Sequence, residues 1–421
     1  MAHEGSNRAF AEQGLSADDL FAEMETIAAG DQRWDDPRNL KASYWAGDDV
    51  VAVMHQAYAR HIDDNAIYGA ALFPSLLRYE AEVVAMALDM LEAPAGAAGG
   101  ITTGGTESIL MAVRTARDWG RVHRPGASRP EIILPETAHP AFEKAAQVVG
   151  MGVVRMQSSP DWRADVAAME AAIGENTVML VGSAPPYPYG IVDPIADIAA
   201  LAQAHGLWMH IDGCIGGFLL PFLADLGELV PAFDFRVAGV SSISADLHKF
   251  GYSGRGASLL LLRDRANETF QRFQSDAWPS GTYSTLNFGG SRNGGAIASS
   301  WAVMRYLGRA GYRERVASIL ATKRAIADGL TADGRLAVLG RPEGANICIV
   351  SQSLDMVAVA EGLDEKGWLT GRLQRPPGLL LLITPRHAGI VDALLADMLA
   401  VADDVESGRR TAQGSAAVYV G

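Results

Sequence analysis

The sequence predicts an α/β protein with a large, mostly parallel sheet and a second, smaller α/β region near the C-terminus. Two observations point to this fold class. Short apolar runs alternate along the chain with segments whose apolar residues recur at helical spacing. Such alternation is typical of a parallel sheet that helices cover on both faces. The chain also has 421 residues, of which 49% are hydrophobic and 20% charged, so it is long enough for two globular domains.

The N-terminal part is expected to be helical. Apolar residues at helical spacing predict helices over residues 16–29, 48–61 and 79–91. A loop-like stretch over 31–47 separates the first two helices. A link rich in Gly, Ala and Pro, over 93–100, leads into the sheet.

Strands and helices alternate beyond this link. The predicted strands are 131–134, 153–156, 177–182, 208–211, 236–241 and 257–262. The predicted helices are 109–119, 140–149, 162–173 and 195–205. A long, broken helix over 296–330 then leads to the C-terminal α/β region, from about residue 336. We therefore predict an N-terminal helical segment (1–60), a large domain (61–305) and a small C-terminal domain (306–421).

Composition excludes several classes of partner. The formal net charge is −14 and no basic cluster interrupts it, which argues against nucleic acid or an anionic membrane surface. The two cysteines, Cys214 and Cys348, give neither a disulfide framework nor a zinc-ligand spacing, so no metal site is expected. The N-terminus lacks the apolar core of a signal peptide, and no apolar run is long enough to span a bilayer. We expect a soluble, cytoplasmic protein.

The most informative segment is 241–252, where an apolar run ends in the pair His248–Lys249. A lysine at the end of a buried strand is expected to have a lowered pKa and can form a Schiff base with an aldehyde. For an isolated His-Lys pair, a solvated lysine at a strand end would be the better interpretation. Three further motifs upstream favour the reactive lysine.

The first of these motifs is a glycine turn over 102–108 that enters an apolar helix. Gly104 and Gly105 allow a close backbone approach, and Thr106 adds a hydroxyl donor. Backbone N–H groups at a helix N-terminus bind phosphate. The alternative is an ordinary N-cap formed by Thr106 or Ser108.

The other two motifs supply His139 and Asp212, each at the end of a predicted strand. His139 could stack on an aromatic cofactor ring at the carboxyl end of the sheet, or it could cap the following helix. Asp212 ends an apolar strand, where a carboxylate is unfavourable unless it pairs with a cation such as a pyridinium N–H. The alternative for Asp212 is a cap of the next turn. The ordered set of phosphate turn, histidine, aspartate and lysine predicts a site for pyridoxal 5′-phosphate (PLP).

With these residues, the chain resembles the fold-type-I PLP enzymes of the group II decarboxylase superfamily, and within it the sphingosine-phosphate lyase branch. The resemblance runs from about residue 40 to beyond 385. The matching stretches are 104–111, 138–146, 187–194, 210–218, 233–252 and 290–294. The resemblance implies a large domain with a mostly parallel, seven-stranded sheet and a small C-terminal α/β domain.

The resemblance also implies roles for individual residues. Lys249 would bind PLP covalently, His139 would stack on its ring, and Asp212 would pair with the pyridine nitrogen. The cofactor phosphate would be held by Gly105, Thr106 and His248 of the same chain and by Gly290 and Ser291 of a second subunit. The pattern therefore implies a homodimer with shared active sites.

The positions at which the lyases bind their substrate differ in this chain. Arg255 stands where the lyases have a lysine six residues after the PLP lysine, and Asn65 is followed by Tyr68 where they have a histidine. The tyrosine expected before the Gly47–Asp48 pair is shifted, to Tyr44 or Trp45. Arg255 could grip a phosphate or a carboxylate through two hydrogen bonds. We therefore assign Arg255, Asn65 and Tyr68 to substrate binding.

The leading interpretation is a PLP-dependent carbon–carbon lyase. It would cleave a β-hydroxy amine or β-hydroxy amino acid, with a phosphorylated sphingoid base as the family default, to an aldehyde and an aminated fragment. The base is Lys249 or a nearby tyrosine, for which Tyr189 is the candidate because it replaces a histidine of the lyases. The alternatives are a PLP-dependent amino-acid decarboxylase and a PLP-binding protein without catalysis.

Overall fold

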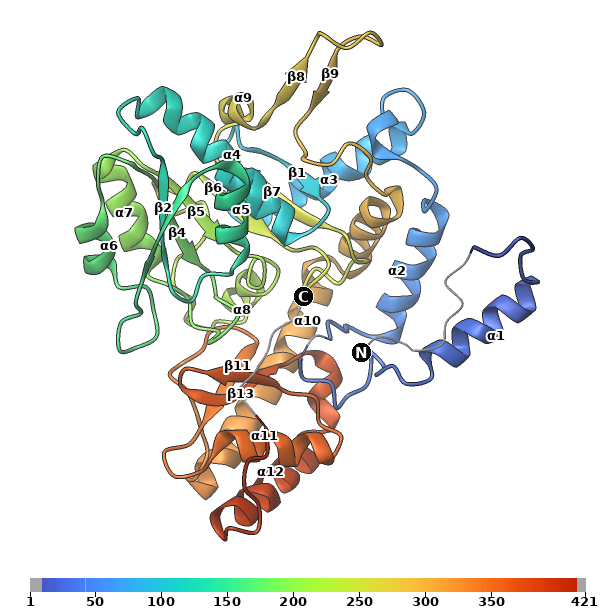
Figure 1. Cartoon of the computed structure of the whole chain (residues 1–421), viewed down its shortest axis with the longest axis vertical. Coiled ribbons are helices and arrows are strands. Elements are labelled where there is room, and N and C mark those ends of the chain that lie inside the picture. Colours follow the sequence, from blue (N-terminus) through green and yellow to red (C-terminus); the bar gives the residue numbers. More distant parts are fainter. Residues whose placement is uncertain (1–9, 42, 415–421) are drawn as a thin grey trace.

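The computed structural model describes residues 10–41 and 43–414. A seven-stranded sheet forms its centre, with the strand order β1-β7-β6-β5-β4-β2-β3 (Figure 1). Only β7 runs antiparallel to its neighbours, β1 and β6. The strands are β1 (Ala98–Thr102), β2 (Glu131–Pro135), β3 (Gly152–Met156), β4 (Thr177–Ser183), β5 (Trp208–Asp212), β6 (Ser242–Ala245) and β7 (Ser258–Leu262). The mostly parallel, seven-stranded sheet is thus confirmed.

Helices cover both faces of this sheet because its strands are apolar on both sides. Ile132 and Leu134 of β2 pack in one hydrophobic cluster with α4 and α5, whereas Ile133 between them belongs to the cluster that contains α7. The helices of this domain are α4 (Gly105–His123), α5 (Ala141–Val149), α6 (Val166–Ala172), α7 (Ile195–His205), α8 (Leu220–Asp225), η2 (Arg265–Asn267) and α9 (Glu268–Gln271).

Two strands differ from the prediction. The link predicted over 93–100 contains β1, whose Gly99 lies so close to β7 that a Cβ there would be 2.5 Å from the Leu261 side chain. The strand predicted over 236–241 is a series of turns, and the strand is β6 instead. Gly239 has a φ of 91°, which breaks the extended run, and Arg236 turns back onto Asp234 at 2.6 Å.

The N-terminal elements lie beside the large domain. They are α1 (Ala17–Ala28), α2 (Asp48–Arg60), η1 (Ala66–Tyr68) and α3 (Pro74–Met90). The helices α2 and α3 pack against α10 (Gly294–Asp333), whereas no residue of α1 is buried and this helix projects from the body (Figure 1). A two-stranded hairpin, β8 (Phe273–Ser275) and β9 (Tyr283–Thr285), projects from the end of the molecule that lies away from the C-terminal elements (Figure 1).

The C-terminal region is built on a four-stranded antiparallel sheet of order β10-β11-β13-β12. Its elements are β10 (Ala337–Val338), β11 (Asn346–Val350), α11 (Met356–Glu365), β12 (Gly371–Gln374), β13 (Pro377–Leu382), η3 (Pro385–Gly389) and α12 (Val391–Glu406). The domain boundary that we propose between residues 305 and 306 lies inside α10, close to its single non-helical residue, Gly308. No helix among the described residues is long and apolar enough to cross a membrane.

Candidate active site

The predicted motifs meet at one edge of the large sheet. His139 follows β2, Asp212 ends β5, and Lys249 follows β6, while the glycine turn joins the end of β1 to α4. Because these four strands are parallel to one another, their carboxyl ends lie on the same edge. In open α/β sheets this edge is where ligands bind.

The glycine turn leaves the N-terminus of α4 open to a ligand. Gly104 is the N-cap, with a φ of 151°, and no side chain caps the helix within the described part of the chain. Ser108, one of the caps considered above, instead contacts the hydroxyls of Thr102 (2.7 Å) and Ser258 (2.9 Å). Backbone N–H groups of the first turn are therefore available at the positive end of the helix dipole, which suits a phosphate.

Lys249 differs from the prediction in its charge. Its Nζ lies 2.8 Å from the Asp246 carboxylate, which is buried. Burial acts to lower the pKa of Lys249, but the charge of Asp246 outweighs it and the pKa is raised well above its ordinary value. The expected lowering is therefore wrong, because Asp246, three residues before Lys249, supplies a counter-charge.

His248 and His139 are both held as neutral rings. Nδ1 of His248 accepts from the Ala257 N–H at 3.2 Å, and Nδ1 of His139 accepts from the Ala141 N–H at 3.1 Å. Burial lowers the pKa of each, against an opposing effect of nearby aspartates. His248 lies against the glycine turn, since its Cε1 is 3.5 Å from where a Gly104 Cβ would be. His139 keeps an exposed side, as stacking on a planar ring requires.

Of the two carboxylate oxygens of Asp212, one accepts hydrogen bonds from the described residues and the other is open to a ligand. Its Oδ1 accepts from the Cys214 N–H at 3.1 Å and from Ser244 at 3.5 Å. Oδ2 accepts no hydrogen bond from the described residues, although the residue is only 7% exposed. A buried acceptor of this kind fits a protonated pyridine nitrogen.

These observations test whether the site suits PLP. The open helix N-terminus, the open oxygen of Asp212, the exposed side of His139 and the primary amine of Lys249 match its phosphate, ring nitrogen, ring face and aldehyde respectively. The residues fit the cofactor.

Tyr44 is the aromatic residue that reaches the site, which resolves the choice between Tyr44 and Trp45. The Arg255 guanidinium lies 5.5 Å from the Tyr44 ring centre, and Tyr44 packs edge-on against Phe250 at 5.2 Å. Trp45 points elsewhere, since its ring lies 4.7 Å from the Arg386 guanidinium. Arg255 also lines a cavity of about 120 Å³ with Thr103 of the glycine turn.

Asn65, Tyr68, Gly290 and Ser291 gather in a separate cluster. Nδ2 of Asn65 donates to Ser291 Oγ at 2.9 Å, and Oδ1 of Asn65 accepts from the Arg292 N–H at 3.2 Å. Tyr68 is 55% exposed and follows Asn65 in the same short helical turn. The described contacts join these residues to one another and not to Lys249. If Gly290 and Ser291 serve a second subunit, Asn65 and Tyr68 lie with them.

Tyr189 lies between the large domain and the C-terminal sheet. Its hydroxyl donates to the Arg375 carbonyl at 2.5 Å, and the residue is 6% exposed. Burial, followed by the charge of Glu136, raises the pKa of Tyr189 to about 12. This contact gives the hydroxyl a structural partner, and a role for Tyr189 in proton transfer stays a prediction.

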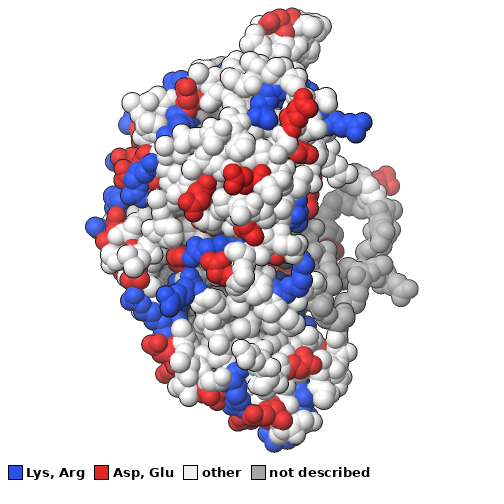
Figure 2. All heavy atoms as spheres, turned by 90° about the vertical axis from the view of Figure 1, so that its left-hand side faces the viewer, with Lys and Arg blue, Asp and Glu red and all other residues white. Residues whose placement is uncertain are grey.

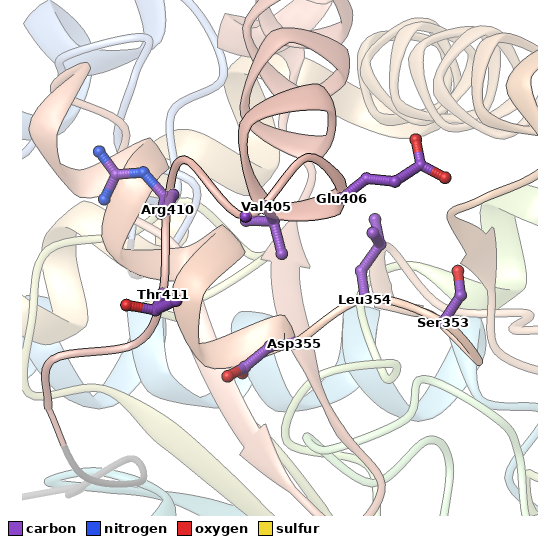
Figure 3. Close-up of a pocket in the computed structure, with 8 residues that line it drawn as sticks. Ser353, Leu354, Asp355, Val405, Glu406, Arg410 and Thr411 are labelled. Carbon is purple, nitrogen blue, oxygen red and sulfur yellow. The ribbon is translucent and has the colours of Figure 1, made fainter.

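A larger cavity, of about 300 Å³, lies in the C-terminal region between the start of α11 and the end of α12. Its walls include Asp355, Glu406 and Arg410 (Figure 3). None of the motif residues lines it, so the smaller cavity at Arg255 is the better candidate for the site. Over the face shown in Figure 2, acidic and basic side chains are interspersed, in keeping with the absence of a basic patch in the sequence.

Two residues with clear contacts had no role in the sequence interpretation. Asp246 stood within the His-Lys motif, and only its distance to Lys249 reveals the ion pair. Glu107 stood within the glycine-turn motif, and its carboxylate joins this turn to the loop before Ser291. A carboxylate three residues into a helix was the available signal, since this is the capping-box position.

Comparison with known proteins agrees with the fold and the motifs. Residues 2–351 match the family described as the pyridoxal-dependent decarboxylase conserved domain. The chain is 37% identical over 361 residues to the sphingosine-1-phosphate lyase of Arabidopsis thaliana, which covers 85% of this chain and 66% of the relative. It is 33% identical over 412 residues to that of Dictyostelium discoideum, with 97% and 77% covered. The chain therefore spans about two thirds to three quarters of the length of these relatives.

Solved structures show the same relationship. A sphingosine-1-phosphate lyase from Burkholderia pseudomallei superposes with a TM-score of 0.91 at 36% identity, and 97% of this chain and 95% of that chain are covered. The glutamate decarboxylase of Lactobacillus brevis, at 19% identity and a TM-score of 0.83, shares the fold with 96% of each chain covered. This chain therefore belongs to the pyridoxal-dependent decarboxylase family, and its cofactor is pyridoxal 5′-phosphate.

Proposed function

We propose that this protein is a carbon–carbon lyase that cleaves a β-hydroxy amine carrying an anionic group, with a phosphorylated sphingoid base as the leading substrate. The products are an aldehyde and an aminated fragment. The observation that carries the proposal is the position of the Arg255 guanidinium. Arg255 lies six residues after Lys249 and stacks on Tyr44 beside the cofactor site. The similarity to proteins named sphingosine-1-phosphate lyase supports the same reaction class.

The residues of the site have distinct tasks in this proposal. Bound PLP would supply an electron sink for the bond that breaks next to the substrate amine. Asp212 would hold the protonated ring nitrogen through its open oxygen, and His139 would pack on the ring face. Asp246, 2.8 Å from Lys249, keeps this lysine protonated in the cofactor-free site. Lys249 in its neutral form, or Tyr189, would take the β-hydroxyl proton, because the ammonium form of Lys249 cannot accept one.

Arg255 would select the substrate. A guanidinium presents two parallel N–H donors, which match two oxygens of a phosphate or a carboxylate. Stacking on the Tyr44 ring restricts the plane of the guanidinium. The same site, by gripping a side-chain carboxylate, would suit the alternative reaction, the decarboxylation of an acidic amino acid.

We also propose that the protein acts in the cytoplasm as a homodimer with shared active sites. Both cysteines are free and buried, as expected in a reducing compartment. Exposed apolar side chains gather on α1, where Phe21 is 61% and Ile27 73% exposed, and Phe288 beside Gly290 is 65% exposed. Apolar surface of this kind favours a subunit interface.

The test is to incubate the PLP-loaded protein with a panel of substrates and to measure aldehyde and carbon dioxide in parallel. The panel comprises phosphorylated sphingoid bases, their unphosphorylated forms, β-hydroxy amino acids and simple amino acids. We expect aldehyde from the phosphorylated bases and none from the Lys249→Ala variant. Release of carbon dioxide without aldehyde would instead establish the decarboxylase.

A further inference from the structure

Glu107 joins two loops through one buried carboxylate. Its Oε2 accepts from the backbone N–H (2.7 Å) and the hydroxyl (2.6 Å) of Thr103, in the glycine turn. Its Oε1 accepts from the N–H groups of Phe288 (2.9 Å) and Gly289 (3.2 Å), in the loop that precedes Gly290 and Ser291. Glu107 is 9% exposed, and each oxygen serves one loop.

Only a carboxylate of this length can make this junction. All four partners are donors, so both oxygens must be acceptors. A glutamine offers one acceptor oxygen and an NH₂ group that would face N–H donors, and an aspartate is one methylene too short to reach both loops. The junction is also favoured by position, because Glu107 lies in the first turn of α4, at the positive end of the helix dipole.

The loop after β9 is also fixed to the end of β1. Nδ2 of Asn287 donates to the Ile101 carbonyl at 2.8 Å, and the Arg292 guanidinium donates to the same carbonyl at 2.9 Å. Arg292 also pairs with Glu80 at 2.7 Å. The segment between Asn287 and Arg292 is thus held at both ends. Between these two residues, Glu107 links the segment to the glycine turn. Glu107 thus binds the two residues that directly precede Gly290 and Ser291.

We propose that Glu107 is a positioning residue that couples the two cofactor sites of the dimer. This inference rests on the shared active sites proposed above, in which Gly290 and Ser291 of one protomer reach the phosphate in its partner. Phosphate binding at the glycine turn fixes the position of Thr103 in one protomer. Through Glu107, this fixes the loop that the same protomer contributes to the second site. The second PLP then meets a loop that is already held in its binding position, so it binds more tightly.

Mixed dimers separate the two roles of Glu107. Two chains with different tags are co-expressed, and the dimer that carries both tags is purified. One chain carries Lys249→Ala, so the Schiff-base absorbance during a PLP titration reports only the surviving site. Glu107→Gln is placed either on the chain with Lys249, next to its own phosphate turn, or on the Lys249→Ala chain, whose loop reaches the surviving site.

We expect both placements to weaken PLP binding at the surviving site by about tenfold, the effect of losing one hydrogen bond to a charged acceptor. An effect only when Glu107→Gln lies on the chain with Lys249 would overturn the coupling. Glu107→Asp, tested in the same two positions, should act in the same way and serves if the glutamine variant does not fold. Unmixed wild-type dimers should bind PLP with positive cooperativity that Glu107→Gln abolishes.

Two controls distinguish this inference from the proposal on which it rests. Ser291→Ala on the Lys249→Ala chain reports whether the loop reaches the surviving site. If Ser291→Ala weakens PLP binding there and Glu107→Gln does not, the sites are shared but Glu107 does not couple them. If neither has an effect, shared sites and coupling are both wrong. Glu343→Gln removes a half-buried carboxylate that joins Arg163 to the Val192 N–H, and it should leave the surviving site unchanged. An equal effect of this control would refute a specific role of Glu107.

Discussion

At the scale of single residues, the pair Lys249–Asp246 decides when the protein can capture its cofactor. A lysine must be neutral to attack an aldehyde, and Asp246 keeps Lys249 charged. Because the pKa of Lys249 is raised in the folded protein, the ion pair stabilises the fold at neutral pH. That contribution is lost only as the pH rises through the raised pKa of Lys249.

Asp246→Asn removes the counter-charge and leaves burial to act alone, so the pKa of Lys249 should fall. The direction follows because an opposite charge in contact favours the protonated amine, and burial disfavours it. We expect Schiff-base formation by cofactor-free protein to accelerate with rising pH, and the whole profile to move to lower pH in Asp246→Asn. Stopped-flow absorbance over pH 6 to 10 measures it. Coincident profiles would contradict the role given to Asp246.

Arg255→Met should raise the KM for an anionic substrate by about 10- to 100-fold, since a charge-assisted pair of hydrogen bonds is lost. The KM for a neutral analogue should change little, and Arg255→Lys should recover part of the loss. Arg121→Met, at the far end of α4, is the matched control. Equal effects on both substrates would show that Arg255 does not bind the anion.

At the scale of elements, the start of α4 packs without space for a side chain. A Cβ on Gly105 would lie 2.8 Å from Asp246 and 3.1 Å from the Cys214 sulfur. Gly105→Ala should therefore displace the helix start or the Asp246 carboxylate and weaken PLP binding by about tenfold. Gly174→Ala is the control, because a Cβ there meets nothing within 4 Å. Calorimetric titration with PLP compares the two, and unchanged affinity in Gly105→Ala would refute the close contact.

The elements also show what the sequence could predict. Central strands such as β4 were predictable because they are buried along their whole length and read as continuous apolar runs. β1 was not, because a strand with Gly99 and Gly100 at its centre resembles a link, and only its pairing with β7 makes it a strand. In the site, the order of motifs predicted the cofactor residues. The partners Asp246 and Glu107 depend on distances that no spacing in the sequence reveals.

His387 ties the C-terminal region to the N-terminal segment and should make the protein sensitive to acid. Its Nδ1 accepts from the Thr384 N–H at 2.9 Å, and its Nε2 donates to the Asn39 carbonyl at 3.1 Å. Burial lowers the pKa of His387 to about 4, so protonation favours the unfolded chain. Its contribution to stability is complete above about pH 6.5 and is lost as the pH falls towards 4.

We therefore expect the free energy of unfolding to drop between pH 7.5 and 5 by about 2 kcal/mol more in the wild type than in His387→Gln. Urea titrations at the two pH values measure the difference. Parallel losses in both proteins would show that His387 does not titrate in this range.

At the scale of the whole molecule, the exposed apolar residues of α1 are the surface on which the proposed homodimer can be tested. Phe21→Asp combined with Ile27→Asp should convert the proposed homodimer to monomer at micromolar concentration and reduce activity, because the shared sites that we propose need both subunits. Sedimentation velocity over a concentration series measures the change. Glu23→Lys, on the same helix, should leave the dimer intact. A double variant that stays dimeric and active would place the interface elsewhere.

The helix α10 runs through both halves of the molecule. Near its start, Gly295 lies against Tyr58 of α2 and Trp301 donates to Glu82 of α3. Farther along, Gly329 lies against Leu395 of α12, in the C-terminal region. The break between them is Gly308, with φ 54° and ψ −178°, a conformation open almost only to glycine. Neither half can therefore complete its core if the chain is divided there. On heating, we expect a single calorimetric transition for the protomer. A gene split at residue 305 should yield two insoluble fragments that recover structure only when they are co-expressed.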